Sequence, residues 1–241
     1  MNSDERYVYF MVKFSGDYSF DEDTLLIPID TISNQGNLSM TDTGVSFNRE
    51  ADFVISINGK DNSRIMVDSY YDVFYFLYGN QYKMIDEISD ITLKNSGRFH
   101  QMRLCTGYEM TIPSTKKKVA FDSYETGKLS YGNGDPESED YRSLSDFIYN
   151  SEARVLEIRI PWQLLNVMDP STKIVMSDFY AEQSISPLYF DGFNVGFGLA
   201  ADGAEIALDQ SYTYNGWEMP TFHERLKPAF YKLQKVLKEI G

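Results

Sequence analysis

The stretch ADFVISINGKDNSRIMV (residues 51–67) decides the fold class of this chain. Its first half has the two-residue period of a β-strand, which places three apolar side chains on one face: Phe53, Ile55 and Ile57. Asn58-Gly59 follows, and this dipeptide is the strongest short-range signal for a hairpin turn because both residues tolerate positive φ. A second apolar run then begins. We therefore predict an antiparallel hairpin whose return strand extends over residues 64–78.

Other stretches also have strand-like patterns. Residues 7–14 (YVYFMVKF) are apolar on both faces, which is typical of a strand inside a sheet or covered on both sides. Residues 154–160 (RVLEIRI) alternate between apolar and charged positions. Residues 24–29 (TLLIPI) form a further strand, which Pro28 places at a sheet edge or a strand end. The polar residues 30–44 are expected to form a loop.

The period changes to a helical one at the C-terminus. From Glu224 to Ile240, apolar residues recur on one helical face: Leu226, Phe230, Leu233, Leu237 and Ile240. A basic amphipathic helix can contact a membrane or a partner, but a surface helix more often faces its own core. We predict an all-β fold, a two-sheet antiparallel β-sandwich (jelly-roll-like) over residues 1–222, with a C-terminal amphipathic α-helix over 223–241 packed on the same domain.

The composition limits the classes of partner. The formal net charge is −14, and such an acidic surface repels phosphate backbones, so no nucleic-acid partner is expected. No run of about 18 apolar residues occurs, so membrane insertion is not expected either. Cys105 is the single cysteine, which excludes an internal disulfide; it lies among apolar residues and is expected to be buried. Neutral polysaccharides and cations are compatible with the charge.

The N-terminus gives an expectation about the parent protein. Residues 1–6 (MNSDER) are acidic and lack the apolar segment of a signal peptide, and a strand begins almost at once at Tyr7. This abrupt start indicates a piece cut from a longer protein. A single cysteine fits a cytoplasmic protein and equally an exported bacterial one with a large core, so the redox compartment stays open.

Residues suited to catalysis are few. The two histidines, His100 and His223, belong to no metal-ligand pair, and the nucleophile-elbow, phosphate-loop and kinase motifs are absent. Glu157 is the acid within a well-defined strand, and its neighbour Arg159 makes a surface ion pair the simplest interpretation. We predict that the chain is not an enzyme.

Two acidic clusters are candidate calcium sites, because hard cations take several oxygen ligands from a loop. One is Asp21-Glu22-Asp23; the other lies in the Gly-rich loop of residues 132–140 and contains Asp135, Glu137, Glu139 and Asp140. Neither has EF-hand spacing, and runs of acids are usually solvated. No cofactor is predicted, and calcium is the one candidate.

The tryptophans differ in context. Trp162 follows a strand-ending proline and is predicted to be a buried core anchor. Trp217 lies in SYTYNGWEMP (residues 211–220), where aromatic rings in a polar loop suit stacking on a sugar. The alternative is that Trp217 docks the final helix on the sandwich. The candidate ligand-binding residues are Tyr212, Tyr214, Trp217 and Glu218, with His223 and Arg225 nearby.

Three segments, in this order, resemble a known superfamily: an opening strand leading into Ile29-Asp30-Thr31 and Gly36-Asn37, the strand from Ala51 to Ile55, and VLEIRIPW (residues 155–162). The last is similar to the Glu-x-x-Ile-Pro-Trp segment that commonly closes such domains. The superfamily is the β-sandwich group of family 9 carbohydrate-binding modules and DOMON-like domains, and the likeness spans most of residues 5–200.

The chain departs from both branches of that group. Family 9 modules hold sugar between two tryptophans, whereas Trp162 here occupies the structural motif and leaves Trp217, which a tyrosine would have to complement. DOMON-type haem domains use axial Met, His or Lys, and nothing in the sequence fixes His100, Met102 and Met110 on one pocket wall.

The resemblance implies a non-catalytic carbohydrate-binding-like accessory module of a larger exported or cell-surface bacterial protein, with an extracytoplasmic location; a cytoplasmic one stays open. The alternatives are a structural or protein-interaction domain packed against a parent enzyme and, least favoured, a haem-binding domain. The expected partners are a polysaccharide or oligosaccharide and other domains of the parent protein.

Overall fold

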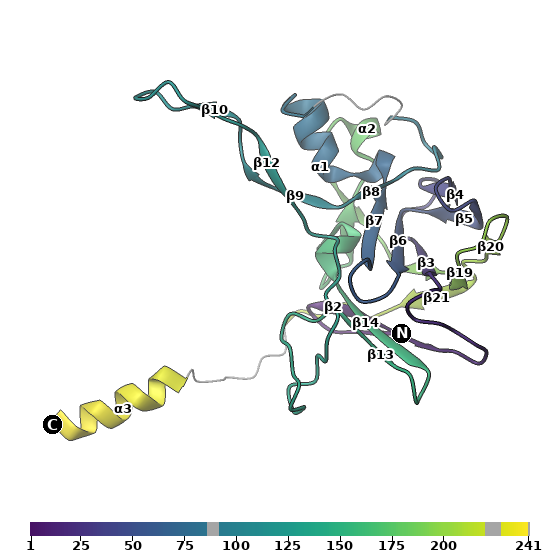
Figure 1. Cartoon of the computed structure of the whole chain (residues 1–241). Coiled ribbons are helices and arrows are strands. Elements are labelled where there is room, and N and C mark those ends of the chain that lie inside the picture. The colour runs from purple at the N-terminus through teal and green to yellow at the C-terminus, as the bar shows by residue number, and fades with distance from the viewer. Residues whose placement is uncertain (86–91, 220–227, 241) are drawn as a thin grey trace.

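The computed structural model describes residues 1–85, 92–219 and 228–240, and this part of the chain is mostly β (Figure 1). Residues 1–85 contain β1 (Asn2–Ser3), β2 (Tyr7–Lys13), β3 (Leu25–Asp30), β4 (Asn37–Met40), β5 (Val45–Ala51), β6 (Phe53–Ile57), β7 (Arg64–Asp68), η1 (Ser69–Tyr71), α1 (Val73–Tyr75) and η2 (Phe76–Gln81).

The remaining elements begin at residue 99. Residues 99–161 contain β8 (Phe99–Gln101), β9 (Arg103–Gly107), β10 (Met110–Thr111), β11 (Lys118–Val119), β12 (Asp122–Glu125), β13 (Phe147–Asn150) and β14 (Val155–Pro161). After them come η3 (Trp162–Leu165), β15 (Val167–Asp169), β16 (Ile174–Met176), α2 (Phe179–Glu182), β17 (Pro187–Tyr189), β18 (Gly192–Val195), β19 (Gly198–Leu199), β20 (Glu205–Ile206), β21 (Gln210–Thr213) and α3 (Pro228–Ile240).

Two larger antiparallel sheets share the main core. One has the strand order β21-β18-β3-β6-β7-β8, with β19 also paired to β3; the other has the order β1-β2-β14-β13. Buried side chains from both sheets belong to a single hydrophobic cluster: Val8, Phe10, Leu156, Ile158 and Ile160 from the smaller sheet and Ile27, Ile29, Phe53, Ile55 and Ile65 from the larger. The predicted antiparallel all-β class is confirmed.

A third sheet covers the outer face of the larger one. β4, β5 and β20 form it, and β20 pairs with β5 in parallel. A second cluster joins Leu26 of β3 and Val54 of β6 to this sheet, so β3 and β6 are buried on both faces. The strand β4 lies inside residues 30–44, which were predicted to be a loop; the correction follows from its apolar Met40, which packs in this second cluster.

Strand β3 lies inside the sheet, so the prediction that Pro28 marks an edge or an end is wrong. Pro28 is in register with Val54 of β6 on one side. On the other side the neighbour is interrupted: β18 pairs with Ile29 and Asp30, β19 pairs with Leu25 and Leu26, and Gly196 N donates to Pro28 O. The missing N–H of Pro28 therefore faces Gly196, at the place where the ladder passes from β18 to β19, and this pair keeps one of its two ladder bonds.

The predicted hairpin forms, but its return strand is shorter than expected. β6 pairs with β7 across a turn in which Gly59 has φ of 62°. The chain turns helical after Asp68, because two aspartates cap successive turns. Asp68 Oδ1 accepts from Tyr70 N at 3.2 Å, and Asp72 Oδ1 accepts from Phe74 N at 3.0 Å. The apolar run of residues 69–78 therefore forms η1, α1 and η2 in place of a strand.

The prediction for Trp162 is confirmed. It opens the short helical turn η3 after Pro161, its side chain is fully buried, and its Nε1 donates to Asp4 O at 2.8 Å. The prediction for Cys105 is wrong, since this residue is half-exposed on β9. The cause is that β9 and β12 form a two-stranded ribbon that leaves the body (Figure 1), so apolar neighbours there do not imply burial. The run from Ile85 to Leu93, whose sequence also predicts a short strand, falls mostly on residues 86–91, outside the described ranges.

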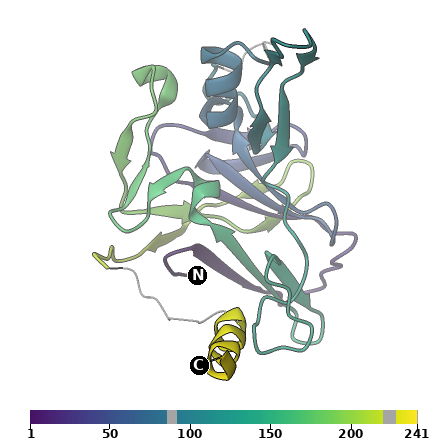
Figure 2. The same cartoon turned by 90° about the vertical axis from the view of Figure 1, so that its left-hand side faces the viewer.

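The C-terminal helix is confirmed as α3, although its predicted first turn lies in residues 220–227, outside the described ranges. Figures 1 and 2 show α3 standing apart from the sheets, and its large apolar side chains are exposed: Phe230, Leu233, Val236, Leu237 and Ile240. The predicted packing of the helix on the same domain is not observed. A helical period specifies an apolar face and not the surface that covers it. Within the described ranges, the helices are too short or too polar to cross a bilayer.

Candidate functional site

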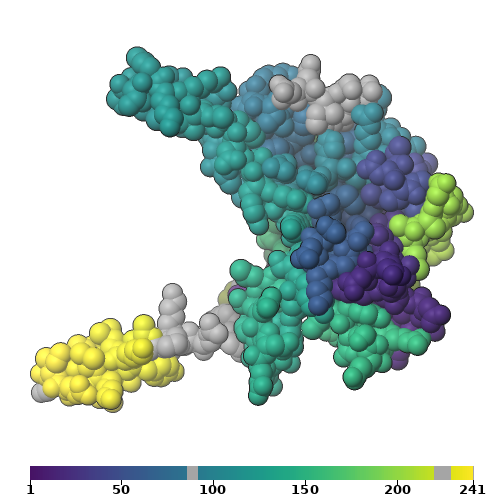
Figure 3. All heavy atoms as spheres, in the orientation of Figure 1, coloured from purple at the N-terminus to yellow at the C-terminus, as the bar shows by residue number. Residues whose placement is uncertain are grey.

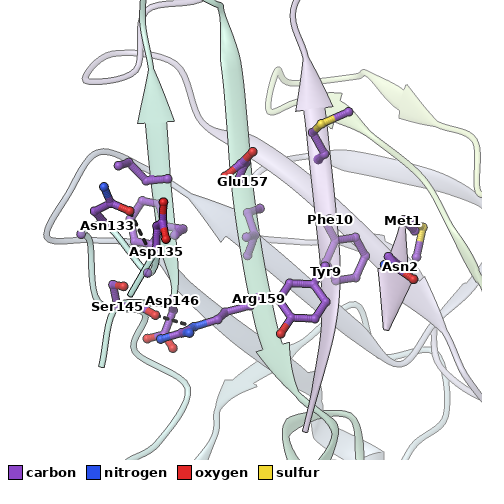
Figure 4. Close-up of a pocket in the computed structure, with 16 residues that line it drawn as sticks. Met1, Asn2, Tyr9, Phe10, Asn133, Asp135, Ser145, Asp146, Glu157 and Arg159 are labelled. Atoms are coloured by element: carbon purple, nitrogen blue, oxygen red, sulfur yellow. Dashed lines mark hydrogen bonds between the residues drawn. The ribbon is translucent and has the colours of Figure 1, made fainter. Parts of the chain in front are cut away.

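A pocket of about 560 Å³ opens on the outer face of the four-stranded sheet (Figure 4). Strands β2, β14 and β13 form its floor, the loop of residues 132–146 forms one wall, and Met1 and Asn2 lie at the opposite rim. The chain reaches this place from three distant segments, and the loop after residue 131 runs beside the sheet before it enters β13.

The two-residue period of β2 and β14 decides which side chains line the floor. In β2, Val8 and Phe10 are buried in the core, so Tyr9 and Met11 point outward. In β14, Leu156 and Ile158 face the core, so the side chains of Glu157 and Arg159 face the pocket, as Figure 4 shows.

The strand register brings these side chains together. Tyr9 is directly opposite Arg159, and Met11 is directly opposite Glu157. Ile148 of β13 lies on the other side of Glu157. Met11 is 65% exposed, so the outer face of β2 is open. Of the two alternatives predicted for this segment, a strand inside a sheet is confirmed, since β2 lies between β1 and β14. Covering on both sides is not found, because the second face of β2 is the floor of the pocket.

Arg159 connects the loop that forms the pocket wall to the sheet that forms its floor. Its Nε donates to Ser145 O at 2.7 Å and its Nη2 donates to Ser143 O at 2.8 Å. Its guanidinium also lies 5.0 Å from the ring centroid of Tyr7. These contacts replace the ion pair with Glu157 that was predicted. The guanidinium presents several N–H donors in a fixed plane, and Nε and Nη2 reach two separate carbonyls of the adjoining loop.

Glu157 is left with an unoccupied carboxylate. Its side chain is exposed, and within the described ranges it takes part in no hydrogen bond or ion pair. An ionised carboxylate only accepts hydrogen bonds, at two oxygens. Glu157 therefore offers acceptors for hydroxyl or amino groups in the middle of the floor.

Two further groups at the pocket are held by the protein itself. Asp146 Oδ2 accepts from Ser130 N at 2.8 Å; burial raises the pKa of this carboxyl, against the opposing effects of the Ser130 bond and of Arg159. The hydroxyl of Tyr9 donates to Asp4 Oδ2 at 2.7 Å, and burial followed by this bond raises the pKa of the phenol. Tyr9 is therefore neutral and presents a fixed ring.

The wall is stiffened by hydrogen bonds within the loop. Asn133 Nδ2 donates to Asp140 Oδ1 at 2.9 Å, and Asn133 Oδ1 accepts from Asp135 N at 3.0 Å. At Gly134, a Cβ would lie 3.3 Å from Ser145 Oγ and 3.5 Å from Arg159 Nη1. The absence of a side chain here lets the loop approach Arg159 closely.

The calcium candidates in this loop do not converge. Asp135 Oδ1 accepts from Glu137 N at 2.9 Å, and Asp140 Oδ1 accepts from Ser138 Oγ at 2.5 Å, so these oxygens satisfy the loop's own donors. The hydrogen bonds from Ser138 and then from Asn133 lower the pKa of Asp140. In the other cluster, Asp23 Oδ2 accepts from Ser19 N. Among the described residues, no three acidic, histidine or cysteine side chains form a group that could hold a metal.

The predicted ligand-binding residues are assembled in part, at a different place. The rings of Tyr212 and Tyr214 stack with centroids 6.4 Å apart, and the Trp217 ring lies 6.2 Å from that of Tyr214. Both tyrosines are half-buried against the main core, where the ring centroid of Tyr214 lies 4.8 Å from that of Trp162.

The polar atoms of this second cluster are also used internally. The Tyr212 hydroxyl donates to Ser3 Oγ at 2.8 Å, and the Tyr214 hydroxyl donates to Pro170 O at 2.9 Å. Glu218 is exposed next to the half-buried Trp217. His223 and Arg225 lie outside the described residues. The rings therefore anchor β21 on the core more than they form an open platform.

The residues considered for haem are scattered. His100 is half-buried in β8, where its Nδ1 lies 2.8 Å from Asp72 Oδ2. Met102 is buried, whereas Met110 is exposed on β10 of the ribbon that leaves the body. The structure does not place them on one pocket wall.

Comparisons of the chain with protein-family models, with curated proteins and with solved structures find no match. The geometry of the pocket therefore carries the functional argument. Its outward residues, Tyr9, Met11, Glu157 and Arg159, have a sequence signal, namely their alternate positions in two strands. The alternation does not predict the register between β2 and β14, because these strands are far apart in the chain.

Proposed function

We propose that this chain is a non-catalytic module that binds a carbohydrate in the pocket on the outer face of the β1-β2-β14-β13 sheet. The observation that carries the proposal is that Tyr9, Met11 and Glu157 lie next to one another on the floor of an open pocket of about 560 Å³. That volume falls in the usual range of about 300–1,000 Å³ for small-molecule sites.

The chemistry of the floor suits a neutral sugar. A pyranose ring has apolar C–H faces that pack on an aromatic ring, and Tyr9 provides such a ring held by its bond to Asp4. Its hydroxyl groups need acceptors, which the unoccupied carboxylate of Glu157 supplies. The rim adds the Oδ2 atom of Asp135, because Oδ1 already accepts from Glu137 N. A phosphorylated ligand is disfavoured, because Asp135, Asp146 and Glu157 all lie at this pocket.

A binding role fits these groups better than hydrolysis. Glycoside hydrolysis needs one carboxyl group free to donate a proton and a second free to act on the sugar or on water. Asp146 has the raised pKa of an acid, but its Oδ2 is occupied by Ser130 N and it faces the Arg159 charge. As part of this proposal, the module belongs to a larger exported or cell-surface bacterial protein, as its resemblance to carbohydrate-binding modules implies.

Affinity gel electrophoresis in soluble polysaccharides tests the proposal. A panel of cellulose, xylan, mannan and β-glucan derivatives is expected to include one that retards the wild-type protein, with a Kd of about 10⁻³–10⁻⁵ M. Tyr9→Ala and Glu157→Gln should each weaken retardation at least about tenfold, whereas Tyr9→Phe should keep most of it.

The controls are matched exposed positions on other elements, Tyr189→Ala on β17 and Glu205→Gln on β20, and they should bind as the wild type does. Retardation by none of the polymers, or retardation unchanged in the Tyr9→Ala and Glu157→Gln variants, would contradict the proposal. Release of reducing ends from a bound polymer would contradict its non-catalytic part.

A further inference from the structure

A two-stranded arm leaves the body of the molecule (Figures 1 and 3). It comprises residues 103–125: β9 pairs with β12 near the body, and β10 pairs with β11 towards the tip. Its base is fixed by the Arg64–Glu125 ion pair at 3.2 Å and by the ring of Phe121, 5.5 Å from that of Tyr78. The arm therefore has a defined direction, away from the protein's own sheets.

The arm carries apolar side chains that the rest of the described chain leaves uncovered. Leu104 and Tyr124 are directly opposite each other across the β9–β12 pair and are 59% and 64% exposed. Nearer the tip, Met110 and Val119 form a second cross-strand pair, also exposed. A two-stranded ribbon in water is marginally stable without a further layer. These pairs are the side chains that a partner would cover.

The tip of the arm has the opposite charge to the molecule as a whole. Lys116, Lys117 and Lys118 follow one another, whereas the chain has 36 acidic and 22 basic residues. Lys118 pairs with Glu109 at 2.9 Å. Within the described ranges, the side chains of Lys116 and Lys117 form no ion pair. A surface that complements this tip must be acidic.

We propose that the arm docks on a second copy of this chain, so that the protein is a dimer. The arm points away from its own acidic body, so the acidic surface that its lysines can reach belongs to another molecule (Figure 3). In a two-fold arrangement the same patch serves both subunits. The Leu104–Tyr124 and Met110–Val119 pairs of one arm then pack against those of the other, and each lysine tip reaches the partner's acidic surface.

Sedimentation equilibrium at protein concentrations from about 1 to 100 µM tests this inference. The wild-type protein is expected to sediment with twice the chain mass of 27.8 kDa. Leu104→Ser combined with Tyr124→Ser should weaken dimerisation at least about tenfold. The matched control is Leu188→Ser combined with Tyr189→Ser, the same substitutions at exposed positions of β17, and it should remain dimeric.

Two more variants separate the apolar and charged contributions. Lys116→Glu combined with Lys117→Glu should weaken the dimer at low salt and much less at 1 M salt, because screening removes the charge effect. Replacing residues 108–121 by Asn-Gly closes the arm at the Gly107–Asp122 pair and should give a monomer. A wild type that is monomeric throughout the range, or arm variants that dimerise as the wild type does, would overturn the proposal. Thermal unfolding of each variant shows whether it folds, and glycan retardation tests the pocket separately.

Discussion

At the scale of single residues, Asp68 links a local turn to the behaviour of the whole protein with pH. Its Oδ1 accepts from Tyr70 N at the start of η1 and from Asn37 Nδ2 at 2.8 Å. Its Oδ2 is buried, and within the described residues no partner reaches it. Burial raises the pKa of Asp68 to about 6, against the opposing effect of the Tyr70 N–H bond. In an unfolded chain the pKa of an aspartate is about 3.9.

This shift predicts a specific pH dependence. Between pH 4 and 6 the folded state binds a proton at Asp68 that the unfolded state has lost, so the free energy of unfolding falls as the pH rises through this window. Asp68→Asn keeps the Oδ1 acceptor and does not titrate. Relative to this variant, the wild type should lose about 2 kcal/mol between pH 4 and pH 7, at 1.36 kcal/mol per pKa unit, because the unfolded-state carboxyl is already about half ionised at pH 4.

Urea unfolding of both proteins across that range measures the difference, and Asp61→Asn, at an exposed position of the β6–β7 turn, is the control. A difference between wild type and Asp68→Asn that is constant or grows with pH would contradict the assignment.

Trp162 is the residue on which we expect stability to depend most. It is fully buried, its Nε1 bonds to Asp4 O, and its ring contacts Tyr214. Trp162→Ala should lower the free energy of unfolding by about 3–5 kcal/mol, the usual cost of emptying a large aromatic site. Trp217→Ala, at a half-buried position, should cost clearly less in the same urea titration. Equal losses for the two variants would show that Trp217 is as much a core residue as Trp162.

At the scale of elements, local sequence predicted the type of many segments and missed those that depend on neighbours. The hairpin turn at Asn58-Gly59 and the strand ending at Pro161 were correct, because a two-residue period and turn residues are local. The aromatic residues after Asp68 favour a strand, but the capping by Asp68 and Asp72 turns this run helical. Pro28 predicts an edge or a strand end, whereas its interior place depends on the break between β18 and β19, which a distant segment supplies.

Helix α3 gives a prediction at the same scale. Because its large apolar side chains are exposed, removing residues 228–241 should change the free energy of unfolding of the remaining chain by less than about 0.5 kcal/mol, as for other surface changes. Urea unfolding of the shortened and full chains provides the comparison. A loss of more than about 1.5 kcal/mol would show that α3 packs on the sheets, as its helical period had led us to expect.

At the scale of the whole molecule, the pocket depends on the register between β2 and β14, which could not be predicted from the sequence. Tyr9 meets Arg159, and Met11 meets Glu157, only because β2 and β14 pair along their full lengths. The aromatic stretch at residues 211–217 was a more visible candidate, since its rings are close in sequence. In the fold, those rings anchor β21, and the open polar surface lies on the other sheet.

The most direct test of the central claim is a map of the binding site by NMR. ¹H–¹⁵N spectra are recorded while the protein is titrated with the soluble oligosaccharide of whichever polymer retards it. The account predicts that the largest shifts fall on β2, on β14 and on residues 132–146, and that Glu157→Gln strongly reduces them. Shifts centred on residues 210–219, or no shifts with oligosaccharides of any polymer in the panel, would contradict it.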